Sequence, residues 1–286
     1  MSWSLDDIVD LDAYPIDQAD GDAYAELVAS ARASLQVDGC VVLKDFVRSS
    51  ALQQFSKEVS ARKHLTHFST ESINPYFHTD FNDEYPPQHP VNTFTERSSG
   101  FVPGDAWETT TAHRILFEEP RFGRLLADCR ELDSLYPYAD PLAGLTENVL
   151  NPGQQFSWHF DTNEFAVTVL VDEADEGGLF EYVPNIRSAS DEGFAAIQAV
   201  LDGGRDGVRT LQLQPGDLQI FRGRYSLHRV TRVGEDSAPR HTAIFAYTEQ
   251  PGVIGRVVRT RQLFGRVLPE HEAAEAARVR SDALLD

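Results

Sequence analysis

The sequence has few of the features that mark secreted, membrane-bound or disulfide-stabilised proteins. Its two cysteines, Cys40 and Cys129, are too few to form a disulfide framework in a chain of 286 residues. No apolar run reaches the roughly 18 residues that predict a transmembrane helix. Residues 1–7 include two aspartates and lack the basic and then apolar order of a secretory signal. We therefore expect a soluble protein of the cytoplasm.

Positive charge is also scarce, which restricts the possible partners. Lys and Arg number 25 against 45 Asp and Glu, giving a net charge of -20. Because nucleic acids and anionic lipid surfaces are themselves negative, we expect neither as a partner. Residues 205–268 reverse the trend, with 11 arginines against five acidic residues. We interpret most of these arginines as surface charges and expect a few to line a pocket for anions.

The first third of the chain shows mainly the periodicity of helices. Apolar residues recur at helical spacing over 20–37, and we expect further helices at 49–65 and 120–132. A short apolar run at 40–43 predicts a buried strand. Residues 74–105 are rich in Pro, Asn, Asp and Gly and predict a long loop, which is uncommon unless functional. We expect this loop to cover one end of the fold.

From about residue 142 the pattern changes to short apolar or alternating runs separated by turn residues. Eight runs predict strands, as expected for a sandwich or a rolled barrel. They lie at 145–150, 155–160, 165–171, 178–183, 208–213, 217–221, 227–233 and 240–248. One helix is expected at 191–201 and a surface helix at 270–285. The sequence predicts a mainly β fold with α, in which an N-terminal helical layer supports a jelly-roll core.

No internal repeat and no low-complexity linker divides the chain, so we expect one domain over 1–286. Within it, 1–135 would supply the helical support and the covering loop. Residues 136–250 would form the jelly-roll core, and 251–286 would form a helical extension.

Two short segments, far apart in the sequence, carry a possible metal-ligand set. His159 and Asp161 belong to a Trp-His-Phe-Asp segment, and alternate residues of a strand face the same side. His228 follows an apolar run and a turn. Two imidazoles and one carboxylate form the facial triad of non-haem Fe(II) oxygenases. A histidine and an aspartate two residues apart are a weak signal alone, and the setting of His228 strengthens it.

Downstream of His228, Arg240 and Thr242 share one face of an apolar run. A guanidinium group can bind a carboxylate through two parallel hydrogen bonds, and a neighbouring hydroxyl can donate a third. This pair suits the far carboxylate of a 2-oxo dicarboxylate co-substrate. We therefore expect Arg240 and Thr242 to bind 2-oxoglutarate.

Over about residues 145–250 the chain resembles the 2-oxoglutarate/Fe(II)-dependent dioxygenases, in the ligand pair, the distal histidine and the arginine after it. The resemblance implies a double-stranded β-helix, also called a jelly roll or cupin-like fold. It also implies Fe(II), 2-oxoglutarate and O2 as cofactor and co-substrates, with succinate and CO2 as co-products.

Further segments are similar to a bacterial branch of this family that includes hydroxylases and halogenases of free amino acids. They are residues 97–100, 137–142, 159–168, 178–184 and 221–224. The similarity implies an amino-acid-like substrate, for which Arg97 could bind the carboxylate and Asp140 the ammonium group. The related halogenases have a small residue where this chain has Asp161. We therefore expect hydroxylation of an unactivated C–H bond and no halogenation.

Other functions are compatible with the same residues. Desaturation or ring closure would use the same cofactors, and a cupin-like protein could bind a metal and a small molecule without turnover. Hydroxylation of a protein side chain is a further possibility, although the long covering loop disfavours it. The substrate and the oligomeric state stay open. The other histidines considered are expected to be solvated: His64, His67, His78, His89 and His113.

Overall fold

The computed structural model describes residues 3–276 and residue 285. Its α-helices are α1 Leu5–Ile8, α2 Asp22–Asp38, α3 Ser49–Arg62, α4 Ala112–Glu118, α5 Pro120–Cys129, α6 Phe194–Leu201, α7 Val257–Phe264 and α8 Pro269–Ala276. Among the described residues, no helix is long and apolar enough to cross a bilayer.

A seven-stranded antiparallel sheet forms the larger wall of the fold, in the order β1-β10-β7-β12-β5-β3-β2. Its strands are β1 Cys40–Leu43, β2 His67–Ile73, β3 Thr95–Val102, β5 Leu145–Leu150, β7 Ala166–Asp172, β10 Leu218–Phe221 and β12 Arg240–Phe245. Strands distant in the sequence thus become neighbours. This arrangement brings segments from both halves of the chain to one interior.

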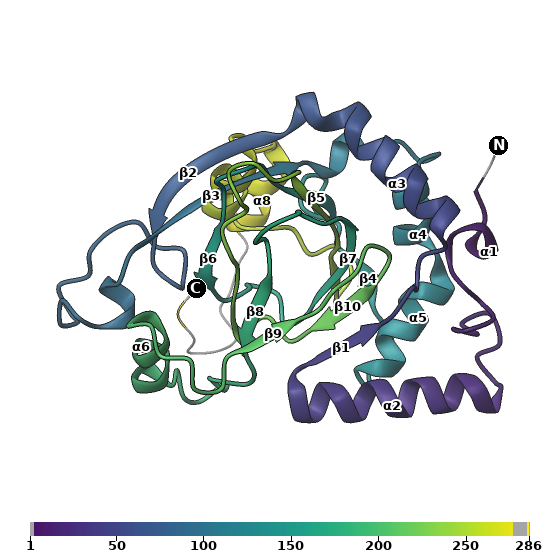
Figure 1. Ribbon diagram of the computed structural model, residues 1–286, viewed down its shortest axis with the longest axis horizontal. Coiled ribbons are helices and arrows are strands. Elements are labelled where there is room, and N and C mark those ends of the chain that lie inside the picture. The colour runs from purple at the N-terminus through teal and green to yellow at the C-terminus, as the bar shows by residue number, and fades with distance from the viewer. Residues whose placement is uncertain (1–2, 277–284, 286) are drawn as a thin grey trace.

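A four-stranded sheet in the order β6-β11-β8-β9 forms the second wall. Its strands are β6 Phe156–His159, β8 Phe180–Val183, β9 Arg209–Leu211 and β11 Leu227–Val230. The strands curve around a common interior, so the predicted jelly-roll core is confirmed (Figure 1). A short pair, β4 Tyr136–Pro137 and β13 Tyr247–Thr248, joins the ends of the core segment.

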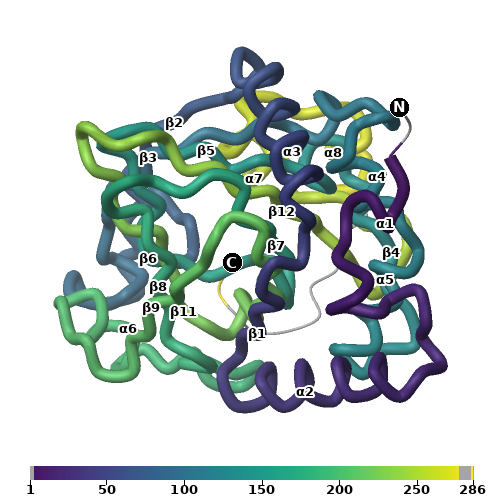
Figure 2. The backbone as a smooth tube through the Cα atoms, turned by 45° about the vertical axis from the view of Figure 1, so that its right-hand side comes forward, coloured from purple at the N-terminus to yellow at the C-terminus, as the bar shows by residue number. Residues whose placement is uncertain are grey.

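Side chains of the larger sheet alternate between two environments. On β12, Ala243 and Phe245 belong to the apolar core shared with helices α1–α5, whereas Thr242 and Ile244 face the other way, into the barrel. In Figure 2, α1, α3, α4 and α5 lie toward the right, α2 runs along the bottom, and most of the strands lie to their left. The helices therefore cover the outer face of the sheet and leave its inner face to the site.

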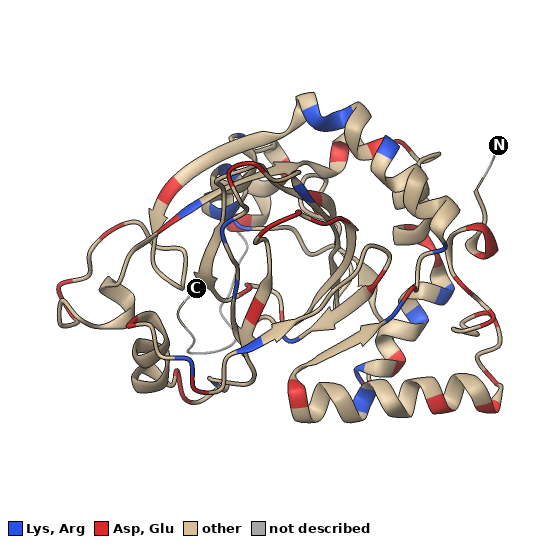
Figure 3. Cartoon of the chain, in the orientation of Figure 1, with Lys and Arg blue, Asp and Glu red and all other residues tan. Residues whose placement is uncertain are grey.

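Part of the acidic excess lies near the N-terminus. Figure 3 shows acidic residues along α1, α2 and the connection between them. Arg48 is one of the basic residues that meet them, since it lies 3.4–3.9 Å from the carboxylates of Asp6, Asp10 and Asp12. This charge therefore lies on the helical layer, away from the inner face of the sheet.

The structure confirms the expected helices near 20–37, 49–65, 120–132 and 191–201 and all eight expected strand regions. The expected loop at 74–105 is wrong at its end, because 95–102 forms the buried strand β3. Its polar segment Thr-Glu-Arg-Ser-Ser lacks a hydrophobic pattern, and β2 and β5 supply the hydrogen bonds that hold it.

The individual elements α1, β2, α4 and β4 were not expected, whereas α7 lies within the helical extension expected at 251–286. Through β1, β2 and β3 the segment 1–135 supplies three strands of the larger sheet, in addition to helices. Of the tail helix expected at 270–285, α8 forms its beginning, and 277–284 lie outside the described residues.

Candidate metal centre

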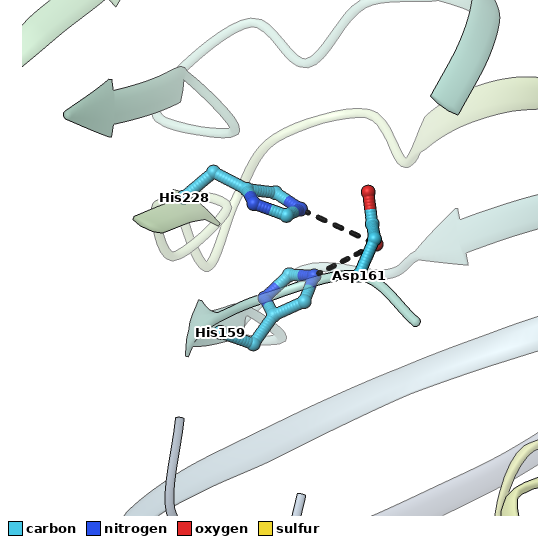
Figure 4. Close-up of side chains that lie close together, drawn as sticks. All are labelled: His159, Asp161 and His228. Atoms are coloured by element: carbon cyan, nitrogen blue, oxygen red, sulfur yellow. Dashed lines mark ion pairs between the residues drawn. The ribbon is translucent and has the colours of Figure 1, made fainter. Parts of the chain in front are cut away.

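His159, Asp161 and His228 meet at the inner end of the smaller sheet (Figure 4). His159 ends β6, Asp161 follows it, and His228 lies on the neighbouring strand β11, directly opposite His159. Asp161 Oδ1 lies 3.9 Å from Nε2 of His159 and 3.5 Å from Nε2 of His228. Ligand atoms of all three residues therefore converge on one point.

The hydrogen bonds of both imidazoles leave one nitrogen of each available. Nδ1 of His159 lies 2.7 Å from the carbonyl oxygen of Ser157, and Nδ1 of His228 lies 2.9 Å from that of Ser226. A carbonyl can only accept, so Nδ1 carries the proton and Nε2 keeps its lone pair. Such second-sphere contacts are characteristic of metal-binding histidines.

Asp161 is the most exposed member of the group. Its side chain is 27% exposed, against 5% for His159 and 6% for His228. Its Oδ2 has no hydrogen-bond partner among the described residues. A buried carboxylate oxygen without a donor is costly in an apolar setting, and a bound cation would remove that cost. The donor set and this oxygen both fit a divalent metal ion.

Gly223, which the sequence alone did not single out, determines how Asp161 sits. Its carbonyl oxygen accepts a hydrogen bond from the Asp161 amide at 3.1 Å. A Cβ added at Gly223 would lie 1.8 Å from Asp161 Oδ2. Any side chain there would displace the carboxylate, so this position requires glycine.

The electrostatic setting favours the ligand forms of these residues. Burial, together with the neighbouring His228, holds the pKa of His159 well below its ordinary value, so its imidazole is neutral. Burial alone would raise the pKa of Asp161, but His228, His159 and Arg259 together hold this pKa below its ordinary value. A neutral imidazole and an ionised carboxylate are the forms that bind metals.

Residues 74–78 cover the strand that carries His159. The Asn74 side-chain oxygen accepts from the amides of Tyr76 and His78 at 3.0 and 2.9 Å, which fixes a tight turn. Within it, Phe77 has a φ of 66°. Its ring meets the His159 imidazole edge-on at 5.2 Å. The expected covering segment therefore places an aromatic wall beside the metal centre.

A cavity of about 1160 Å³ opens beside Asp161. Its wall combines apolar side chains, among them Phe77, Phe156 and Ile244, with charged ones. The charged lining residues, apart from Asp161, are Glu164, Arg224, Arg256, Arg259 and Glu275. A cavity of this kind is typical of small-molecule sites.

Arg240 and Thr242 lie on the inner face of β12, as expected, in the row that continues to Ile244 on the cavity wall. Both are buried, and Arg240 Nη1 donates to Thr242 Oγ1. Burial lowers the pKa of Arg240 to about 10, with Glu147 acting in the opposite direction, so the guanidinium remains charged at neutral pH. Neither residue is among the described residues that line the cavity.

Arg97 is not where its predicted role requires it. It lies fully buried on β3, where its guanidinium donates to the hydroxyls of Ser69 and Ser99 and lies 3.7 Å from Glu71. It also lies 5.7 Å from the ring centroid of Phe156. Arg97 is not among the described cavity residues, and the structure does not support its expected contact with substrate.

The contacts of Asp140 do not support its expected substrate role. Its Oδ1 accepts from the amides of Leu142 and Ala143, each at 2.8 Å. Its Oδ2 accepts from the Gly255 amide at 2.8 Å and lies 3.0 Å from His271 Nε2. These four contacts occupy the acceptor positions of a carboxylate. Asp140 therefore stabilises a turn and anchors α8, which leaves no acceptor for an ammonium group.

The expectation of solvated histidines also fails at one position. His64 is exposed, but the side chain of His113 on α4 is fully buried. Its Nδ1 lies 2.7 Å from Glu58 and its Nε2 lies 3.4 Å from Glu147. The apolar residues of the same helix, Leu116 and Phe117, are buried too, a pattern that could have indicated its inward face.

The family model described as Halogenase D matches residues 117–253, which contain the predicted ligands and Arg240. No curated protein matches the sequence. AviO1 from Streptomyces viridochromogenes Tue57 is a similar solved structure, with a TM-score of 0.53 and 15% identity, covering 79% of this chain and 96% of AviO1.

A second similar structure is that of the epimerase SnoN in complex with Fe3+, alpha ketoglutarate and nogalamycin RO. It has a TM-score of 0.52 and 12% identity, and the match covers 78% of this chain and 84% of SnoN. At such low identity these likenesses show a shared fold.

Proposed function

We propose that this chain is an enzyme of the 2-oxoglutarate/Fe(II)-dependent oxygenase class and that it hydroxylates an unactivated C–H bond of a free amino acid or a similar small molecule. Fe(II), 2-oxoglutarate and O2 are the cofactor and co-substrates of this class. The observation that carries the proposal is the convergence of three ligand atoms beside a cavity with charges of both signs.

In this proposal His159, Asp161 and His228 hold the iron. The two Nε2 lone pairs and the carboxylate of Asp161 leave other coordination positions for 2-oxoglutarate and O2. Bound iron with its co-substrates supplies the oxidising chemistry. The protein supplies orientation through the Ser157 and Ser226 carbonyls and excludes water through Phe77 and Phe156.

We assign Arg240 and Thr242 to the far carboxylate of 2-oxoglutarate. Arg240 is charged and buried, and an interior cation that meets an anion avoids an uncompensated charge. Thr242 accepts a hydrogen bond from Arg240 and keeps its own hydroxyl proton to donate. Both residues are on the inner face of β12, which also carries the cavity residue Ile244.

The charges of the cavity support a zwitterionic substrate. Arg224 and Arg259 can meet a carboxylate, whereas Glu164 can meet an ammonium group. Desaturation or ring closure of an amino-acid-derived metabolite is the second candidate, since it would use the same residues and cofactors. The fold also serves reactions other than hydroxylation, because SnoN, which shares it, is an epimerase. A cupin-like binding protein without turnover is less favoured, since the family model that matches residues 117–253 is described as a halogenase, which is an enzyme.

We also propose that the chain acts as one oxygenase domain, because β1, β2 and β3 complete the same sheet as the core strands. We further propose that the product carries oxygen and no halogen. With a metal bound, Asp161 would supply a ligand at the position that a halide would need, and its charge would oppose an anion beside it.

Anaerobic difference spectra test the proposal. Fe(II) and 2-oxoglutarate should together give an absorption band, and one or more of the standard amino acids should shift it. Product mass, measured in excess chloride, should show a gain of one oxygen, whereas loss of two hydrogens would favour the second candidate. A response to peptides or neutral aromatics alone would contradict the substrate class, and a halogen isotope pattern would contradict hydroxylation.

A further inference from the structure

Helix α7 brings basic residues to the wall of the cavity. Arg256 precedes the helix, and Arg259 and Arg261 lie within it. Arg256 and Arg259 line the cavity, whereas Arg261 is exposed and is not among the described lining residues. The helix packs against β2 and β3, so its inward side chains reach the interior of the barrel. The helix lies in the helical extension expected at 251–286, but a role for Arg259 was not expected from the sequence.

The position of Arg259 relative to the metal centre is defined by two ring contacts. Its guanidinium carbon lies 3.3 Å from the ring centroid of Phe77, and that ring meets the imidazole of His159 at 5.2 Å. Nη1 of Arg259 also donates to Gln262 Oε1 at 3.1 Å, within the helix. One aromatic ring therefore separates this charge from a proposed iron ligand.

The neighbouring Arg256 has a different role. It lies 3.6 Å from Glu275 Oε1, and the other oxygen of Glu275 accepts from the Val257 amide at 3.2 Å. These contacts join α7 to α8. Of the two cavity arginines near this helix, Arg259 is therefore the one directed toward the metal centre by its contact with Phe77.

We propose that Arg259 binds the carboxylate of the substrate and thereby fixes which carbon faces the iron. This inference rests on the proposed function and moves the carboxylate contact from Arg97 to α7. A guanidinium binds a carboxylate through two hydrogen bonds, and packing on an aromatic ring restricts its orientation. Because a single ring separates Arg259 from His159, the oxidised carbon lies only a few bonds from the carboxylate.

The test compares free amino acids with their carboxamides, which differ only in the group that Arg259 is proposed to bind. The holoenzyme and the variants Arg259→Met and Arg259→Lys are assayed for substrate-triggered succinate formation. Arg261→Met is the matched control, because it removes an exposed arginine from the same helix. The Fe(II)/2-oxoglutarate absorption band, recorded without substrate, shows that each variant still forms its metal centre.

Arg259→Met should raise the KM of the acid about 30-fold or more and change the KM of the amide less than about threefold. The KM of the acid in Arg259→Lys should lie between those of the wild type and Arg259→Met, because lysine keeps the positive charge but cannot form the paired hydrogen bonds of a guanidinium. Arg261→Met should match the wild type. An unchanged acid KM in Arg259→Met, or equal increases for acid and amide, would overturn the proposal.

The failure of the proposed function has a different signature. A wild-type enzyme that responds to no amino acid contradicts the amino-acid substrate, and the same comparison is then made with other carboxylic acids and their amides. If the wild type prefers the acid and Arg259→Met does not, the result still supports the proposed contact between Arg259 and the carboxylate. A wild type without any preference for the acid overturns it.

Discussion

A three-residue cluster of histidine and carboxylate side chains is buried inside the barrel, and another is buried beneath the helices. The inner cluster is His159, Asp161 and His228, and the outer cluster is Glu58, His113 and Glu147. In the inner cluster each Nδ1 is bound to a main-chain carbonyl, and both Nε2 atoms point to a common carboxylate (Figure 4). Only one of its side chains, that of Asp161, is more than slightly exposed.

In the outer cluster both nitrogens of one imidazole face carboxylates. The His113 ring also lies between Phe55 and Trp107, with centroid distances of 3.9 and 4.5 Å. Glu58 accepts from the amides of Ala112 and His113 as well, so it holds the start of α4. The same residue types can therefore act as metal ligands where nitrogen lone pairs converge beside a cavity. They stabilise the packing where the imidazole ring is enclosed by other side chains.

Replacing an inner ligand should give the largest functional difference between the clusters. His159→Ala, Asp161→Ala or His228→Ala each removes one of three proposed ligands, so substrate-triggered succinate formation should be lost. Thermal unfolding of the metal-free protein should change much less than activity. The exposed His64→Ala serves as the control. Wild-type succinate formation by any one variant would remove that residue from the proposed ligand set.

Replacing the outer histidine should have the opposite pattern. His113→Leu leaves Glu58 and Glu147 buried without their partner, which should cost about 3–5 kcal/mol of folding free energy. Denaturant unfolding measures this loss, and turnover well below the melting temperature should persist. The double variant His113→Leu/Glu147→Leu should regain part of the stability. If His113→Leu lost turnover but kept its full folding stability, the outer cluster would have a role in the reaction itself.

A variant of Arg240 tests the proposed 2-oxoglutarate site, whose charge interacts through the sheet with Glu147 of the outer cluster. Glu147, on the outer face of β5, raises the pKa of Arg240 on the inner face, against the larger effect of burial. Arg240→Ala should weaken 2-oxoglutarate binding by about 2–4 kcal/mol and leave Fe(II) affinity nearly unchanged. Titration of the co-substrate measures this, with the exposed Arg232→Ala as control. An unchanged 2-oxoglutarate requirement would exclude this assignment.

The smallest expected effect is the pH dependence of the outer cluster. Burial alone would lower the pKa of His113, but Glu147 and Glu58 raise this pKa above its ordinary 6.5. The protonated His113 therefore contributes fully to folding stability below pH 6.5, and this contribution is lost as pH rises through the raised pKa. Burial alone would raise the pKa of Glu58, but hydrogen bonding to His113 holds this pKa below its ordinary 4.5. The contribution of the ionised Glu58 to folding stability is therefore lost as pH falls through the lowered pKa. The stability difference between wild type and His113→Leu should therefore be largest between these values, as melting curves across pH can show. An increase of this stability difference at alkaline pH would contradict the prediction.

The sequence predicted those features that are local. Alternation and turn residues located the core strands, and the spacing of His159 and Asp161 on one strand end placed both side chains together. The pairing of β6 with β11, which completes the group, follows from the jelly-roll order of the strands.

Features that depend on distant contacts were not predicted. β3 reads as a polar loop, because its neighbouring strands and not its own pattern hold it in place. Asp140 has its acceptors occupied by donors that include Gly255 and His271, more than a hundred residues away. Arg259 is one of many arginines in the sequence, and only its packing on Phe77 distinguishes it.

The bond between each ligand histidine and the carbonyl two residues before it has a consequence for assembly. His159 is aligned by Ser157 and His228 by Ser226, so each half of the centre is oriented by its own strand. The two halves meet where β6 pairs with β11 and where the Asp161 amide donates to the Gly223 carbonyl. Metal affinity during refolding therefore measures the formation of this strand pair, and a chelator-sensitive folding step would mark the closure of the barrel.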